Sequence, residues 1–335
     1  LFDLAALLMS TLLMRPGIQS KAARGYYLWH DKKVSPVAEF PFLPINPKEP
    51  LSQVFIDGIS FSLMHLQKVI EQYFVKPSLH NLSLINQALL LIRNGFWVFE
   101  PLMTDEMIAI RKEISHFLKM LAWHNNAKNL HEIITKSSSY RKKIEYNQQL
   151  VSQLKLEKRR FPSTEQVCEM LQSARFNLLQ LSLLKMVLAG REQLKSADEL
   201  SVFKFCTKTM ESSLVDIEKE MPSDSKMTAD QYLSQKRTLN RSLLTGSWCG
   251  EIFDEKARIE YRAPWLDIMQ GITELETLTM LRQQLLQLQA IEHDDNKENK
   301  PEKLLTWLDN KIESLLTALD ASRQMALIVP PYWRN

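Results

Sequence analysis

The chain has 335 residues, of which 45% are hydrophobic and 24% charged, and this balance argues against a disordered chain and a membrane-embedded one. Its 8 glycines are few for an α/β enzyme with phosphate-binding loops or for an all-β protein with many tight turns. A net charge of +3 does not by itself predict nucleic-acid binding, so any anion site must come from local clustering of charge.

The first 50 residues combine an apolar segment with a proline-rich one. Residues 1–14 are largely apolar, but Asp3 interrupts them and they are too short to span a bilayer, so we expect an amphipathic helix. Residues 15–30, "RPGIQSKAARGYYLWH", place Lys21 and Arg24 between a Pro-Gly turn and an aromatic cluster. Five prolines in residues 31–50 then favour an extended, stiff connector.

After residue 50, apolar residues recur every three or four positions, which is typical of helices. Segments 51–74 and 82–99 have this pattern, and a third segment follows Thr104. Segment 176–189 is so apolar that we expect a central helix buried on most sides. Capping residues predict further helix starts, and Gly or Pro residues predict helix ends: starts at Ser163, Ser196 and Thr228, ends at Gly190, Pro222 and Gly246. The sequence therefore predicts an all-α body of eight to ten helices.

Catalytic and metal-binding motifs are missing from the sequence. There is no GxxxxGK[ST] or GxGxxG, and "HEIIT", 131–135, has Thr135 where a zinc site needs its second histidine. The segment "HDDNKEN", 293–299, lacks the Gly and Glu of a calcium loop and is expected to be solvated. Three widely spaced cysteines without a CxxC pair favour a reducing, cytoplasmic setting. We therefore predict no catalytic residues and no metal ligands in this chain.

Two clusters of basic residues are the remaining candidates for function. Residues 136–160 hold eight basic residues against two acids, a pattern that fits either solvated helix faces or a polyanion surface. Lys236, Arg237 and Arg241 lie in a stretch without acids, 231–250, and the two arginines are one helical turn apart. Guanidinium groups that point the same way suit a linear polyanion, although a solvated face is an equally open interpretation.

Histidines and tryptophans offer weaker candidates. His124, Lys128 and His131 could share one helix face, but surface or capping histidines are the simpler interpretation. Trp97 and Trp123 lie in apolar segments and are interpreted as core residues, not as ligand-stacking residues.

Several of these segments resemble the arginine-bearing helices of CHAD domains: "LINQALLLIRNGFWVFEPL" (84–102), "IRKEISHFLKMLAWHNNAKNL" (110–130) and "YLSQKRTLNRSLLTGSW" (232–248). The resemblance implies a pair of antiparallel helical bundles around a basic groove, over about 51–190 and 191–335. It also implies polyphosphate contacts at Arg93, Lys128, Lys236, Arg237 and Arg241. The chain departs from the family at the expected histidine and three of its arginines, which fall at Ser83, Asn86, Leu90 and Leu91.

Residues 15–30 are similar to the segment that joins a CYTH catalytic domain to a CHAD domain in bacterial inorganic triphosphatases, and "VPPYWRN", 329–335, resembles their tail. This resemblance implies that residues 1–30 are the end of a CYTH tunnel, with Lys21 and Arg24 as tunnel residues, and that 31–50 is a linker. The CYTH signature ExExK is absent, since "ELETL", 274–278, ends in Leu. Mg²⁺ or Mn²⁺ is therefore expected only with the missing CYTH domain.

Two hypotheses follow from these resemblances. The first is a CHAD-like module of an inorganic triphosphatase, catalytically incomplete in this chain, that binds polyphosphate or a similar polyanion beside its CYTH domain in cis. The alternative is a decayed CHAD domain that acts as a scaffold or dimerisation module. RNA binding is less favoured because no RNA-binding module is recognisable, and no membrane partner is expected.

Overall fold

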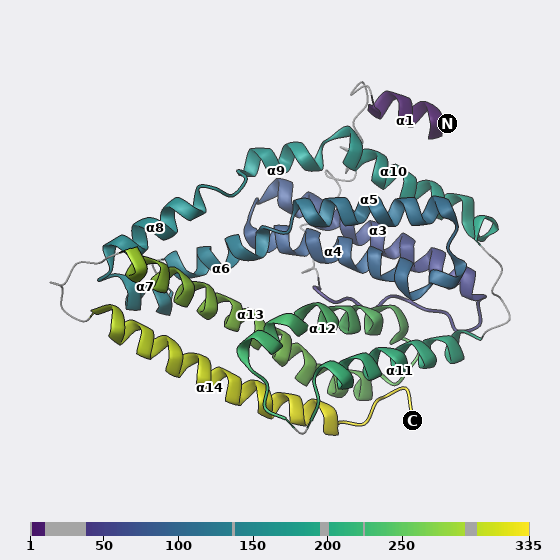
Figure 1. Cartoon of the computed structure of the whole chain (residues 1–335). Helices are drawn as coiled ribbons and strands as arrows, with labels where there is room; N and C mark the ends of the chain where they lie inside the picture. The colour runs from purple at the N-terminus through teal and green to yellow at the C-terminus, as the bar shows by residue number, and fades with distance from the viewer. Residues whose placement is uncertain are drawn as a thin grey trace, which may run out of the picture. The chain divides into compact units, whose positions relative to one another are not determined.

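The computed structural model describes residues 2–10, 38–135, 138–194, 201–223, 225–291 and 300–334. All regular structure in these residues is helical, as the sequence predicts, and Figure 1 shows its course. The elements are α1 (Phe2–Ser10), α3 (Leu51–Val75), α4 (Leu79–Val98), η1 (Glu100–Leu102), α5 (Asp105–Met120), α6 (His124–Ile134), α7 (Ser139–Ile144), α8 (Gln148–Lys158), α9 (Thr164–Leu171), α10 (Ala174–Ala189), η2 (Gly190–Gln193), α11 (Val202–Glu220), α12 (Ala229–Cys249), α13 (Glu255–Ile291) and α14 (Lys300–Ile328).

Helix ends follow the capping residues in most of the predicted places. Ser163 and Gln166 form a complete capping box before α9, and Thr228 forms the corresponding pair of hydrogen bonds with Gln231 before α12. Gly190 ends α10 at a φ of +70°, which favours glycine. The predicted end at Gly246 is wrong, because α12 continues to Cys249. The predicted start at Ser196 lies outside the described residues.

Two other expectations about the helices need correction. From α3 onward the described residues contain twelve α-helices, more than predicted, because the chain between residues 121 and 172 breaks into four short ones, α6 to α9. Helix α10 buries only part of its surface: Leu184 and Leu188 are exposed, although the segment is rich in apolar residues. Apolar composition alone therefore overestimated the burial of this helix.

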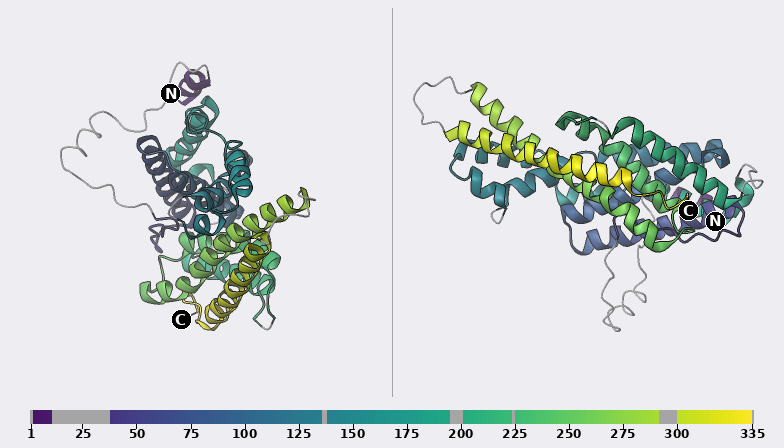
Figure 2. Two further views of the ribbon diagram at one scale, coloured as in Figure 1. Left: turned by 90° about the vertical axis from the view of Figure 1, so that its left-hand side faces the viewer. Right: turned by 90° about the horizontal axis from the view of Figure 1, so that it is seen from below.

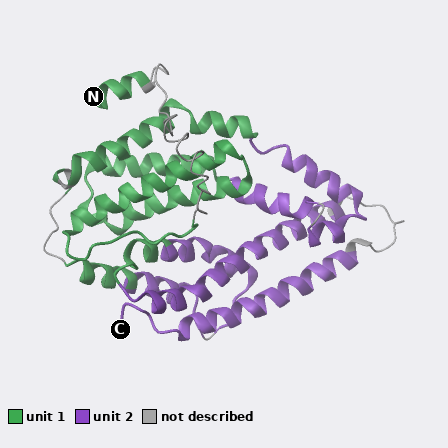
Figure 3. Cartoon of the chain, turned by 180° about the vertical axis from the view of Figure 1, so that it is seen from behind, with its two compact units in different colours: residues 1–122, 163–210, 244–252 green, residues 123–162, 211–243, 253–335 purple. Residues whose placement is uncertain are grey.

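The described chain forms two compact units, each assembled from three separate segments (Figure 3). Unit 1 comprises Leu1–Ala122, Ser163–Met210 and Leu244–Ile252, and unit 2 comprises Trp123–Pro162, Glu211–Leu243 and Phe253–Asn335. The chain passes between the units inside α11 and inside α12. The expected domain boundaries near residues 30, 50 and 190 stay predictions.

The core of unit 1 is built around Trp248, near the end of α12. Its indole N–H donates to the carbonyl of Leu91 in α4 at 2.9 Å, and its ring stacks on Phe55 of α3 with centroids 6.3 Å apart. A Cβ atom added at Gly58 or Gly95 would overlap this ring. Glycines in α3 and α4 thus create the space that the tryptophan fills.

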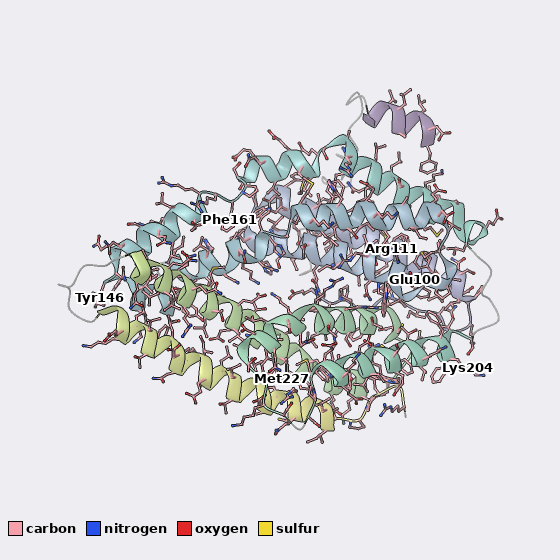
Figure 4. All side chains as sticks on the ribbon, viewed as in Figure 1. Glu100, Arg111, Tyr146, Phe161, Lys204 and Met227 are labelled. Carbon is pink, nitrogen blue, oxygen red and sulfur yellow. The ribbon has the colours of Figure 1, made fainter. Side chains whose placement is uncertain are left out.

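An ion pair on the surface of unit 1 joins η1 to α5. Oε1 of Glu100 and Nη1 of Arg111, both labelled in Figure 4, are 3.1 Å apart. This pair links the short η1 turn after α4 to the second turn of α5.

Unit 2 is organised around the two longest helices, α13 and α14, which lie side by side in Figures 1 and 2. Leu278, Leu281 and Leu285 of α13 pack with Leu308 of α14 and with apolar residues of α6, α7 and α8 in one buried cluster. Pro264 lies inside α13 without ending it.

The loop between α11 and α12 is held by one buried arginine of α14. Arg323 is 1% exposed; its guanidinium donates to the carbonyls of Pro222 and Ser225 and to the carboxylate of Asp320. Tyr232, at the start of α12, donates its hydroxyl to the same Asp320 at 2.6 Å. This network positions α12 relative to α11 within unit 2.

Candidate anion-binding site

A pocket of about 280 Å³ lies in unit 2, between the end of α11 and the middle of α12. Three of its lining residues are basic, two are acidic and two carry hydroxyl groups: Lys219, Arg237 and Arg241; Asp216 and Glu220; Ser213 and Thr238. The net charge of this lining is +1. We call it the α11–α12 pocket.

Helical spacing explains why these side chains converge. On α11, Ser213, Asp216 and Glu220 are separated by three and four residues and so lie on one face. On α12, Arg237 and Arg241 are one turn apart, and both line the pocket, as their spacing predicts. Each helix therefore presents one polar face to the same space.

Hydrogen bonding fixes one of the two carboxylates. Gln235, which is 9% exposed, donates from Nε2 to Oε2 of Glu220 at 3.2 Å. No hydrogen bond or ion pair involves the side chains of Arg237, Lys219 or Asp216 within the part of the chain that the structure describes. These charged groups are thus available to a ligand.

Lys236, the third basic residue of the predicted cluster, does not line the pocket. Its Nζ atom forms an ion pair with Oε2 of Glu276 on α13 at 2.5 Å, and both side chains are about three-quarters buried. The next residue, Arg237, turns toward the pocket because neighbouring helix positions point about 100° apart.

The other predicted contacts lie elsewhere. Arg93 is half-buried on α4 in unit 1, and Lys128 is half-buried on α6 in unit 2. Neither lines the α11–α12 pocket. Lys21 and Arg24 lie outside the described residues.

Four of the five pocket residues that the sequence did not suggest come from α11. Lys219 stands between Glu218 and Glu220, so it belongs to no basic cluster. Only the helical periodicity of the segment that ends at Glu220 could have indicated that Ser213, Asp216 and Glu220 share a face.

Most basic side chains of segment 136–160 are solvent-exposed, as one of its two interpretations predicts: Lys142, Lys143, Lys155, Lys158, Arg159 and Arg160. Arg141 is half-buried, and Lys136 lies outside the described residues. Arg160 pairs with Glu157 at 2.7 Å, and Lys143 lies 5.8 Å from the centre of the Trp307 ring. Tyr146, labelled in Figure 4, follows α7 and is 78% exposed.

The histidine face suggested for α6 is not formed, because His124 is buried while His131 is exposed. Trp97 and Trp123 are half-buried, and Trp123 stacks on Phe161 with ring centroids 5.8 Å apart. Both are thus less buried than the expected core residues, and Trp123 contributes to packing through this stack.

Two of the cysteines that are distant in sequence meet in unit 1. Cys206 of α11 and Cys249 of α12 are both fully buried. The hydrogen bond with Cys206, together with burial, raises the pKa of the Cys249 thiol well above its usual value. Both side chains are free thiols.

Sequence comparison and structural comparison give different results. The sequence matches no protein-family model and no curated protein. The structure, however, is similar to the crystal structure of the CHAD domain from the plant Ricinus communis, with a TM-score of 0.64 and 14% sequence identity over 89% of this chain and 98% of that one. The chain has the fold of a CHAD domain.

A second similar structure is PptA from Streptomyces chartreusis, with a TM-score of 0.57 and 12% identity over 83% of this chain and 99% of that one. At such identities the likeness concerns the fold alone. The CHAD fold expected from the arginine-helix resemblance is therefore confirmed.

Two further findings define what this CHAD fold contains. Among its described residues, no group of three or more His, Cys, Asp and Glu side chains is placed to hold a metal ion. Within the same ranges, no helix combines the length and apolar character that a bilayer span requires.

Proposed function

We propose that this CHAD-fold chain binds phosphate-bearing polyanions through the α11–α12 pocket, with inorganic polyphosphate as the ligand that the family resemblance implies. The observation that carries the proposal is the convergence of Lys219, Arg237 and Arg241 from two helices on one pocket. Arginine presents planar pairs of N–H donors that match phosphate oxygens, and lysine adds a compact charge.

The wider role follows the same resemblance. The chain would be the companion module of a CYTH catalytic domain in cis, within a cytoplasmic inorganic triphosphatase whose Mg²⁺ or Mn²⁺ belongs to the CYTH tunnel. Arg93, Lys128 and Lys236 would be secondary phosphate contacts. Among them Lys236 is the weakest candidate, because Glu276 already neutralises its charge.

Titration with long-chain polyphosphate at low and moderate salt tests the proposal. We expect saturable binding that weakens steeply with salt, because ligand phosphates exchange their counterions for protein cations. Arg237→Glu combined with Arg241→Glu should weaken binding by at least about tenfold, since two charge-assisted contacts are replaced by repulsion.

A control of equal charge change is Lys256→Glu combined with Lys303→Glu, two exposed lysines at the starts of α13 and α14. Equal weakening by both double variants would mean that general charge, not the pocket, attracts the polyanion. Absence of binding by the wild-type chain at low salt would favour the alternative role as a scaffold or dimerisation module.

A further inference from the structure

We infer that the α11–α12 pocket takes its phosphate chain as a complex with Mg²⁺. In this arrangement Lys219, Arg237 and Arg241 contact phosphate oxygens, while Asp216 and Glu220 contact the metal ion or its water shell. The inference rests on the proposed function and specifies the form in which the ligand is bound.

The α11–α12 pocket carries both signs of charge. A site for a bare polyanion gains nothing from carboxylates, because each one repels the ligand at short range. Yet Asp216 and Glu220 line the same space as the three basic side chains. A divalent cation on the phosphate chain converts this repulsion into attraction.

The coordination chemistry of Mg²⁺ suits this lining. This ion usually retains several waters and is held by one or two carboxylates together with phosphate oxygens of the ligand. Asp216 and Glu220 are four residues apart on α11, so their carboxylates lie on the same face, one turn from each other. Two carboxylates do not make a protein-only metal site, and phosphate oxygens would complete the coordination.

Polar groups around the carboxylates also favour a hydrated metal ion. Ser213 is 5% exposed and lines the pocket, and its hydroxyl forms no hydrogen bond within the described ranges, so this group is available to a metal-bound water or a phosphate oxygen. Gln235 donates to Oε2 of Glu220 and so orients this carboxylate. Carboxylates that contact metal ions are typically held in place by a hydrogen bond from a neighbouring side chain, as Gln235 provides here.

The test is the sign of the Mg²⁺ effect on tripolyphosphate binding, measured by calorimetry at constant ionic strength. For a merely basic groove, Mg²⁺ weakens binding because it competes with the protein cations for phosphate. For the proposed site, Mg²⁺ should strengthen binding by at least about fivefold. Weaker binding by the wild-type chain in Mg²⁺ would overturn the inference.

The variant Asp216→Asn with Glu220→Gln should bind bare tripolyphosphate more tightly than the wild type and should lose the strengthening by Mg²⁺. Asp267→Asn with Glu302→Gln, two exposed carboxylates on α13 and α14, is the matched control and should behave as the wild type. If the pocket variant does not fold, Asp216→Asn alone serves, because this exposed side chain has no partner in the described part of the chain.

A direct readout uses Mn²⁺ in place of Mg²⁺. Water-proton relaxation should increase when protein, tripolyphosphate and Mn²⁺ are mixed, and this increase should be lost in the pocket variant but not in its control. An unchanged increase in the pocket variant would also overturn the inference. The proposed function fails separately, if Arg237→Glu with Arg241→Glu leaves tripolyphosphate affinity unchanged in the absence of any divalent ion.

Discussion

The two ends of α12 carry different kinds of side chain: one end is buried in a packed core, and the other presents charged and polar groups. In unit 1, residues 244–249 are all buried, and Trp248 fills the space above Gly58 and Gly95. In unit 2, residues 229–243 alternate between buried anchors and polar side chains, among them Arg237 and Arg241. One continuous helix thus carries a packed core at one end and a candidate ligand site at the other.

This difference in packing predicts which positions of α12 tolerate substitution. A close-packed end accepts little change in volume, because neighbouring atoms cannot relax without losing contacts. An exposed charged side chain contributes little to folding and is therefore open to selection for binding. Stability and affinity should accordingly respond to different residues of the same helix.

The largest effect is expected from Trp248→Ala. The substitution removes a large ring that is 1% exposed and leaves a cavity between α3 and α4. We expect the free energy of unfolding to fall by about 3–5 kcal/mol. Denaturant unfolding followed by far-ultraviolet circular dichroism measures this loss, and a decrease of less than about 1 kcal/mol would mean that the ring is not part of a close-packed core.

Gly95→Ala should lower the free energy of unfolding by about 1–3 kcal/mol, because its new Cβ atom would overlap the Trp248 ring. The cost should shrink when Trp248 is replaced by Phe, since the smaller ring leaves room for the methyl group. A double-mutant cycle measures this coupling between the two positions. Additive effects would show that the two residues do not compete for the same space.

At the other end of α12, Tyr232→Phe should lower stability by about 1–2 kcal/mol. The substitution removes the hydroxyl that donates to Asp320 and leaves this carboxylate with Arg323 alone. Burial raises the pKa of Tyr232, so the hydroxyl remains protonated and the loss should be constant from pH 6 to pH 9. A loss that changes across this range would point to ionisation of another group in the network.

Local patterns account for what could be predicted from the sequence. The periodicity of apolar residues and the capping residues identify helices, because both depend on residues within one or two helical turns, as with Ser163 and Gln166. The common direction of Arg237 and Arg241 has the same origin, since four residues make about one helical turn. These features need no knowledge of tertiary structure.

Contacts between distant residues account for what could not be predicted. Glu276 neutralises Lys236 from 40 positions away, and no local pattern links these two residues. The same holds for Trp248, whose place in the core depends on glycines in two other helices. Lys219 could not be predicted because its acidic neighbours cancel its charge in the sequence, whereas in the pocket it joins two arginines.

The smallest effect on stability is expected from Arg237→Gln, which tests the charged end of α12 most directly. The side chain is exposed and forms no ion pair in the described part of the chain, so the free energy of unfolding should change by less than about 0.5 kcal/mol. Polyphosphate affinity should nevertheless fall several-fold, and its salt dependence should become shallower, because one phosphate contact is lost.

Lys236→Gln is the matched comparison, with the same change of charge at the adjacent position. It removes the partner of Glu276, so stability should fall more than in Arg237→Gln while affinity falls less. The reverse order, with affinity depending on Lys236 and stability on Arg237, would place the phosphate site on the α13 side of the helix. In that case the division of tasks along α12 would stand, but the pocket between α11 and α12 would not be the ligand site.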